Sequence, residues 1–415
     1  MSNELDRAYS PWMLGPLALR NRFIKSATNE GSAPGGTPTT ALVKHHRSMA
    51  AGGVGMTTVA YCAVSPDGKT FDDQVMLGPE TRPHLRVLTD AVHAEGASAC
   101  AQITHGGAFN FLSRLSTSSP VSASGGMNPP GFLSGRLFKH AASASELRGV
   151  RKDFVRGAHE ARQAGFDAVE IHMGHGYLLS QFLSPAYNRR TDEFGGSPER
   201  RARFPKEVLS DVLDAVGSGM AVTCKISIFE GMRGGGTVED AIVTARAMSD
   251  AGAHLIVNSA GMNVESPWQI FGSRMPPGIG GENASAMMRL GNRMLKWQEP
   301  RIQFRELYLL EASRQIRAAV QTPLAYLGGV TSVDGIRQAM ADGFDAIVMG
   351  RALIHRPDLL RAFRNGELSQ SGCDHCNVCV ATMYSPGGTR CVLTSSEDLE
   401  ANRTPAAAAR EPDPV

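Results

Sequence analysis

Short apolar runs rich in β-branched residues recur along the chain, and most are followed by a segment with the spacing of an amphipathic helix. We expect strands at residues 22–28, 54–62, 98–105, 167–173, 221–228, 254–260, 323–328 and 345–350. Glycine commonly precedes these runs by a few residues, which suits a helix C-cap that returns the chain to the next strand. A closed parallel barrel is built from eight such strand-and-helix units, so the pattern predicts an α/β protein with the (β/α)8 architecture of a TIM barrel.

A doubly wound open sheet is the competing architecture for alternating strands and helices. When that fold binds a dinucleotide, a G-x-G-x-x-G turn follows its first strand. No such string follows residues 22–28, so the sequence favours the barrel.

Two connections, residues 106–150 and 261–300, are much longer than the others. The first is rich in Gly, Ser and Pro, and the second contains Trp268, Phe271 and Met275. Both follow strands, so both are expected at the C-terminal rim, where barrel enzymes carry their active sites. We expect them to cover the substrate; surface insertions without a function are the alternative.

Composition and charge indicate which partners and which cellular location to expect for the protein. The 42 Lys and Arg residues nearly balance the 40 Asp and Glu residues, and no basic run resembles a nucleic-acid footprint. No signal-peptide pattern and no apolar stretch approaching 18 residues occurs, so we expect a cytoplasmic protein without nucleic-acid or membrane partners. We expect a barrel domain over residues 1–370, a cysteine-containing extension over 371–395 and a disordered tail over 396–415.

The fifth predicted strand places a lysine inside the barrel. Alternation puts Val222, Cys224 and Ile226 on the face toward the helices and Lys225 on the opposite face. A buried ammonium needs an anionic or electron-rich partner. A bound cofactor is one such partner, and an ion pair with Glu170 is the other.

The fourth strand and the residues after it supply the strongest candidate chemistry. Alternation turns His172 inward, and His175 and Tyr177 follow just past the strand end. Two imidazoles can polarise a carbonyl and a tyrosine can deliver a proton, which is what conjugate reduction requires. A metal site at the two histidines and purely structural roles are the alternatives.

Glycine directly follows the last two strands, in LGGVTS at residues 327–332 and in MGRAL at residues 349–353. Backbone N–H groups at such turns, together with Arg351, could bind a phosphate monoester. These strings by themselves indicate only a phosphorylated ligand, which could be a cofactor or a substrate.

Taken together, these strings resemble the Old Yellow Enzyme family of NAD(P)H:flavin oxidoreductases, from about Pro16 to Val392. The similarity is carried by LRNRFIKSAT, by AQITHGG, by EIHMGHGYLLSQFLSPAYNRRTDEFGGSPERRARF and by GGV followed by MGRALI. The long third string is specific enough to carry the resemblance alone.

The resemblance implies FMN as cofactor, NAD(P)H as co-substrate and a role for each matching residue. Contacts to the flavin ring are implied for Ala27, Thr28, Asn29, Tyr61, Gln102 and Lys225, and contacts to the FMN phosphate for Gly328, Gly329, Gly350 and Arg351. His172 and His175 would hold the substrate carbonyl and Tyr177 would protonate the α-carbon. A homo-oligomer is also implied.

The activity that follows is hydride transfer from NAD(P)H, through FMN, to the activated C=C bond of an α,β-unsaturated carbonyl compound. Many relatives have Pro-Met-Cys or Pro-Leu-Thr where this chain has Ala27-Thr28-Asn29. The resemblance therefore implies that Asn29 is the residue that tunes the reduction potential of the flavin. A non-redox alternative is a barrel lyase whose Lys225 forms a Schiff base.

Four of the seven cysteines cluster near the C-terminus as Cys373-x2-Cys376-x2-Cys379-x11-Cys391. Family members with an iron-sulfur centre show a similar pattern with one more residue between the second and third cysteines. The thiols could hold [4Fe-4S] or zinc, with His375 as another candidate ligand, or they could remain free. A cluster would favour the alternative activities, a 2,4-dienoyl-thioester reductase or an amine dehydrogenase.

Overall fold

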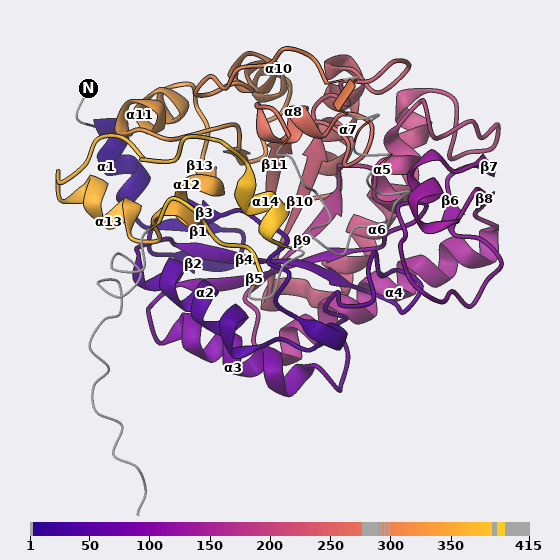
Figure 1. Ribbon diagram of the computed structural model, residues 1–415, viewed down its shortest axis with the longest axis horizontal. Helices are drawn as coiled ribbons and strands as arrows, with labels where there is room; N and C mark the ends of the chain where they lie inside the picture. Colours follow the sequence, from indigo (N-terminus) through magenta and orange to yellow (C-terminus); the bar gives the residue numbers. More distant parts are fainter. Residues whose placement is uncertain are drawn as a thin grey trace, which may run out of the picture.

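The computed structural model describes residues 3–275, 290, 293, 296–297, 299–383 and 388–394. Within this part of the chain, eight parallel strands close into a barrel (Figure 1). They are β3 (Phe23–Lys25), β4 (Met56–Ala63), β5 (Ser98–Thr104), β9 (Ala168–Met173), β10 (Ala221–Ser227), β11 (Leu255–Ser259), β12 (Leu324–Tyr326) and β13 (Ala346–Met349). Seven of them lie inside a predicted strand, β4 ends one residue beyond its prediction, and the predicted (β/α)8 barrel is confirmed.

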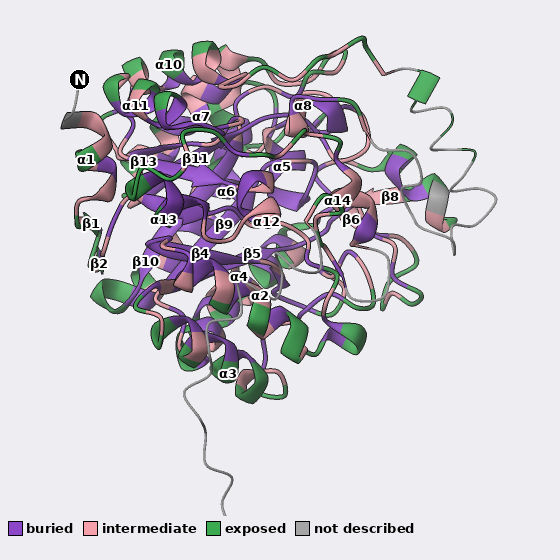
Figure 2. Cartoon of the chain, turned by 60° about the vertical axis from the view of Figure 1, so that its left-hand side comes forward, coloured by how far each residue is buried: buried purple, intermediate pink, exposed green. Residues whose placement is uncertain are grey.

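Helices surround this barrel and bury their apolar faces against its outer wall. The longer ones are α2 (Thr40–Ala51), α3 (Arg82–His93), α4 (Ala144–Gln163), α6 (Pro198–Val216), α7 (Val238–Asp250), α10 (Leu310–Ala319) and α11 (Val333–Ala341). Ser143 with Glu146 at α4, and Thr237 with Asp240 at α7, form capping boxes that satisfy the first free N–H groups. Outward residues of the strands, such as Cys224, share one apolar core with these helices, and Figure 2 shows the buried strands within the more exposed ring.

Shorter helices join or cap these units. They are α1 (Asn3–Tyr9), α5 (Leu178–Leu183), α8 (Pro267–Phe271), α12 (Arg351–His355), α13 (Leu359–Arg364), α14 (Val378–Thr382) and the 3-10 turns at Pro34–Gly36, Pro129–Ser134 and Gly217–Gly219. No helix in the described ranges is long and apolar enough to cross a membrane.

A hairpin that the sequence pattern did not reveal closes the N-terminal end of the barrel. It pairs β1 (Trp12–Leu14) with β2 (Leu17–Leu19) in antiparallel register. Leu14 and Leu19 pack against the innermost residues of the strands, such as Ile24. Gly15 has a φ of +54°, and a Cβ there would lie 2.5 Å from the His254 ring, so only glycine fits this turn. The opposite end of the barrel is therefore the one that can open to ligands.

The two long connections lie where the strands end. The first contains a small sheet in the order β6 (Val121–Ser122), β8 (Phe138–Ala141) and β7 (Gly126–Met127). The second contains α8, and its Phe271 and Met275 line the cavity described below. The rest of that connection lies largely outside the described residues. Phe109 of the first connection also lines this cavity, and the covering of a substrate by the two connections stays a prediction.

The C-terminal extension packs back onto the start of the barrel. Thr389 donates from its backbone N to Glu30 O at 2.7 Å, and a Cβ on Gly31 would collide with Met383 O. In Figure 1 the extension and α14 lie over the mouth of the barrel near β3 and β4. The cysteines are thereby brought close to the barrel rim, whereas the predicted disordered tail, residues 396–415, lies outside the described residues.

Candidate active site

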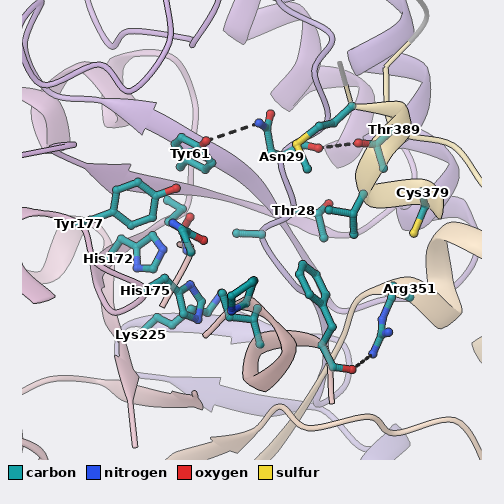
Figure 3. Close-up of a pocket in the computed structure, with 18 of the residues that line it drawn as sticks. Thr28, Asn29, Tyr61, His172, His175, Tyr177, Lys225, Arg351, Cys379 and Thr389 are labelled. Carbon is teal, nitrogen blue, oxygen red and sulfur yellow. Dashed lines mark hydrogen bonds between the residues drawn. The ribbon is translucent and has the colours of Figure 1, made fainter. Parts of the chain in front are cut away.

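A cavity of about 220 Å³ opens at the C-terminal ends of the strands. Its lining includes the predicted site residues Ala27, Thr28, Asn29, Tyr61, Gln102, His172, His175, Tyr177, Lys225 and Arg351. Figure 3 shows several of them turned toward a common space from β9, β10 and the loop after β3. The predicted glycines Gly328, Gly329 and Gly350 are absent from the described lining residues.

The end of β9 brings together the two imidazoles and the phenol. The rings of His172 and His175 are perpendicular with centroids 4.9 Å apart, and the Tyr177 ring lies 4.6 Å from that of His172. Nδ1 of His172 accepts a hydrogen bond from Gly174 N at 3.3 Å. The three residues therefore form a compact group on one wall of the cavity, and no group in the described ranges has an arrangement that could ligate a single metal ion.

Both imidazoles are neutral in the folded protein. Desolvation lowers the pKa of His172 well below its usual value, and it lowers the pKa of His175 to about 3. Repulsion from Lys225 acts in the same direction on each. A neutral imidazole has one N–H donor and one acceptor nitrogen, so each ring can donate one hydrogen bond to a ligand oxygen.

This depressed pKa predicts a specific loss of stability in acid. Below pH 6.5 an unfolded chain protonates His175 while the folded chain does not, so the stabilisation is complete above pH 6.5 and declines as pH falls toward about 3. Between pH 7.5 and pH 5.0, we expect the wild type to lose up to about 2 kcal/mol more than His175→Asn does. Urea unfolding of both proteins at both pH values measures the difference. Equal losses would show that His175 ionises normally in the folded state.

Lys225 lies inside the barrel, as the alternation of β10 predicts, and it also has a protein partner. Its Nζ lies 2.9 Å from Glu170 Oε1, and the side chain is 2% exposed. Gln102 Nε2 donates to the same carboxylate oxygen at 2.7 Å. Lys225 therefore forms the ion pair considered from the sequence and at the same time reaches the cavity wall.

The loop after β3 presents Thr28 and Asn29 in different ways. The Thr28 hydroxyl accepts from Lys25 Nζ at 3.0 Å and donates to Glu30 Oε1 at 2.9 Å. Asn29 Nδ2 donates weakly to Tyr61 Oη at 3.4 Å. Since Thr28 has no further hydrogen to donate, Asn29 is the better donor toward a ligand in the cavity.

Sequence reasoning missed the buried pair of Lys25 with Glu30, which holds this loop. Lys25 is fully buried and Glu30 is 3% exposed, and the two are in direct contact. The signal was available, because Lys25 stands in an apolar strand just as Lys225 does, and the argument that a buried ammonium needs a partner applies equally to it.

Arg351 lines the cavity at the start of α12, but its guanidinium is already engaged. It donates to Phe271 O at 2.6 Å and to Ser273 Oγ at 3.1 Å, and it contacts Asn377. Arg351 thus joins the connection after β11 to the C-terminal extension. Gly329, with a φ of +80°, packs so closely that a Cβ would lie 2.8 Å from the Phe304 ring.

The four C-terminal cysteines line one small second cavity. Cys379 also lines the first cavity, so it stands on the wall between them. Cys391 Sγ lies 3.4 Å from His355 Nδ1, a neighbour that the sequence did not indicate. His375, the other candidate ligand, stacks against the Phe304 ring with centroids 3.4 Å apart.

Comparison with known proteins identifies relatives over nearly the whole chain. Residues 8–274 match the model of the NADH:flavin oxidoreductase / NADH oxidase family. The 4,4'-dithiodibutanoate disulfide reductase of Rhodococcus erythropolis is 40% identical over 395 residues, which cover 93% of this chain and 94% of that protein.

Two solved structures share the fold. A 2-naphthoyl-CoA reductase in complex with 2-naphthoyl-CoA aligns with a TM-score of 0.74 at 22% identity, covering 92% of this chain and 58% of the other. The old yellow enzyme homologue of Zymomonas mobilis aligns with a TM-score of 0.70 at 22% identity, covering 92% and 98%. The likeness at these identities concerns the fold.

Proposed function

The chain belongs to the NADH:flavin oxidoreductase / NADH oxidase family, as its resemblance to Old Yellow Enzyme predicts, and from that premise we propose that it reduces the activated C=C bond of α,β-unsaturated carbonyl compounds with hydride from NAD(P)H. The observation that carries this proposal is the group formed by His172, His175 and Tyr177 on one wall of the cavity. Neutral imidazoles beside a phenol suit a neutral carbonyl substrate.

The proposed role of each of these residues follows from the chemistry of its side chain. Hydrogen bonds from His172 and His175 to the carbonyl oxygen polarise the conjugated system and stabilise the negative charge that develops on that oxygen. Tyr177 then donates its proton to the α-carbon as the β-carbon gains hydride. Desolvation keeps both imidazoles in the uncharged form across the neutral pH range.

The residues present fit FMN as the resident cofactor. Lys225 brings a buried cation to the cavity wall, Gln102 brings an amide, and Asn29 has donor capacity to spare. We propose that these three hold the flavin ring and that Gly328, Gly329, Gly350 and Arg351 hold the phosphate. Bound flavin would supply hydride taken from NAD(P)H, with nicotinamide and substrate using the same cavity in turn.

Family membership favours this redox chemistry over the Schiff-base alternative. Lys225 Nζ lies 2.9 Å from the Glu170 carboxylate, an arrangement suited to an ammonium ion rather than to a free amine nucleophile. A homo-oligomer and a cytoplasmic location remain predictions.

The cysteine cavity supports a second candidate. We propose that Cys373, Cys376, Cys379 and Cys391 hold [4Fe-4S] rather than zinc, since all four line one small cavity that borders the active-site cavity. The described residues contain no group already placed to hold a metal ion, so binding would have to draw the four thiols together. An electron-transfer centre there would favour a dienoyl-thioester reductase or an amine dehydrogenase. The disulfide reductase at 40% identity adds disulfides as a further substrate class.

One anaerobic titration separates these candidates. We expect flavin absorbance that bleaches with NADPH and returns when 2-cyclohexen-1-one is added, and about four irons per chain that disappear in Cys379→Ser. Recovery with 4,4'-dithiodibutanoate but not with the enone would favour disulfide reduction. A protein without flavin absorbance even after reconstitution with FMN would refute the proposed function, and an iron-free protein would refute the cluster.

A further inference from the structure

His175 is held in an unusual backbone conformation by the end of β10 and by the loop that follows β11. Its φ is +61°, a value that non-glycine residues seldom adopt. Its backbone N donates to Ser227 Oγ at 3.1 Å, and its carbonyl accepts from Asn263 N at 3.1 Å. Two independent contacts therefore fix the backbone of this residue, as is common where a strained conformation serves a site.

The ring of His175 has its own anchor. Ser259, the last residue of β11, lies with its Oγ 2.8 Å from His175 Nε2 and is 3% exposed. Ser259 is absent from the described lining residues, so it stands behind the ring. Because Nε2 is engaged with the serine, Nδ1 is the nitrogen of His175 that remains for a ligand.

The direction of this hydrogen bond follows from where each hydrogen can go. In the part of the chain that the structure describes, His175 Nε2 is the single acceptor within reach of the Ser259 hydroxyl. If Nε2 donated instead, the buried hydroxyl hydrogen would have no acceptor, which is costly. The serine therefore donates to Nε2, and His175 carries its own proton on Nδ1.

The tautomer of His172 is fixed by a backbone hydrogen bond. Its Nδ1 accepts from Gly174 N, so its proton is on Nε2. The described residues provide no further partner for this N–H or for Nδ1–H of His175. Both neutral rings consequently offer donors to a ligand, and neither offers an acceptor.

We propose that Ser259 is a positioning residue that sets the tautomer of His175 and thereby selects substrates that present an oxygen acceptor over substrates that present N–H donors. This inference rests on the proposed function, because it specifies what the histidine pair recognises. An acceptor-only side chain at position 259 would reverse the choice, since a carboxylate would draw the proton to Nε2 and leave Nδ1 as an acceptor. Serine therefore suits carbonyl compounds and disfavours amines.

Three substitutions at this position test the idea. Ser259→Ala removes the donor, Ser259→Thr keeps the hydroxyl, and Ser259→Asp substitutes an acceptor. We expect kcat/KM for 2-cyclohexen-1-one to fall about 10- to 100-fold in Ser259→Ala and further in Ser259→Asp, and to stay within about threefold of wild type in Ser259→Thr. Thermal unfolding and FMN content check that each variant is folded and loaded.

The tautomer itself is measured without turnover. In protein labelled with 15N-histidine, with His175→Gln to assign the signal, we expect His175 to show a protonated Nδ1 and an unprotonated Nε2 in wild type and Ser259→Thr, and the reverse in Ser259→Asp. A protonated Nε2 in wild type, or unchanged enone kinetics in Ser259→Ala, would overturn the inference. The expected tautomer in an enzyme that reduces no enone would instead refute the proposed function and leave the role of Ser259 intact.

Discussion

Replacing Tyr177 with phenylalanine is expected to slow the oxidation of the reduced enzyme by 2-cyclohexen-1-one by a factor of about 10² to 10⁴. The substitution removes one hydroxyl and keeps the ring, which is 3% exposed and packs 5.3 Å from Tyr61 and 5.6 Å from Phe109 between centroids. Loss of packing therefore contributes little. Reduction by NADPH requires no proton from this group, so its rate should stay within about twofold of wild type, which stopped-flow absorbance measures for each half-reaction separately.

Tyr9→Phe is a matched control. The Tyr9 hydroxyl donates to Leu360 O at 2.6 Å, away from the described lining of the cavity, so its removal deletes a tyrosine hydrogen bond without touching the proposed chemistry. Stability should fall by about 1 kcal/mol while both half-reactions keep their rates. If Tyr177→Phe oxidises as fast as wild type, the proton comes from another donor or from solvent, and the proposed role of Tyr177 is wrong.

The barrel could be predicted from the sequence because its signals are local. Each strand is a short apolar run, most of them are next to a glycine, and alternation within β10 is enough to separate Cys224 on the outside from Lys225 on the inside. The same alternation placed His172 on the cavity wall. The hairpin of β1 and β2 was missed because its strands are only three residues long and no helix follows either of them, so the repeated strand-and-helix pattern gives no signal there.

The parts of the site that the sequence did not predict depend on contacts between residues far apart in the chain. Ser259 meets His175 across 84 positions, through a register between β9, β10 and β11 that no local pattern specifies. Thr389 reaches the carbonyl of Asn29 across 360 positions, so the closure of the rim by the C-terminal extension could not be inferred from spacing. For Arg351, the sequence predicted the position at a strand end. It did not predict the hydrogen bonds from the guanidinium to Phe271 and Ser273.

Lys225→Met is expected to lower the free energy of unfolding by about 3–5 kcal/mol, because it leaves the Glu170 carboxylate buried without its cation. Gln102 would remain as a neutral donor to Glu170, which compensates only in part. The variant should also lose FMN during ultrafiltration, since the proposed flavin contact disappears together with the ion pair. Urea unfolding with and without excess FMN separates the intrinsic loss of stability from the part that is due to lost ligand binding.

The double variant Lys225→Met/Glu170→Gln distinguishes a structural lysine from one that serves the cofactor. With both charges removed, Gln102 can still donate to the amide oxygen that the substitution introduces at position 170. The two new side chains at positions 170 and 225 are uncharged, so no buried charge is left without a partner. We therefore expect the double variant to recover most of the lost stability. If Lys225 also supplies a cation to the flavin, FMN affinity and the rate of flavin reduction by NADPH should remain low in this stable protein. If FMN binding and flavin reduction recover along with stability, the role of Lys225 is limited to its ion pair with Glu170. Another residue would then have to balance the negative charge of the reduced flavin.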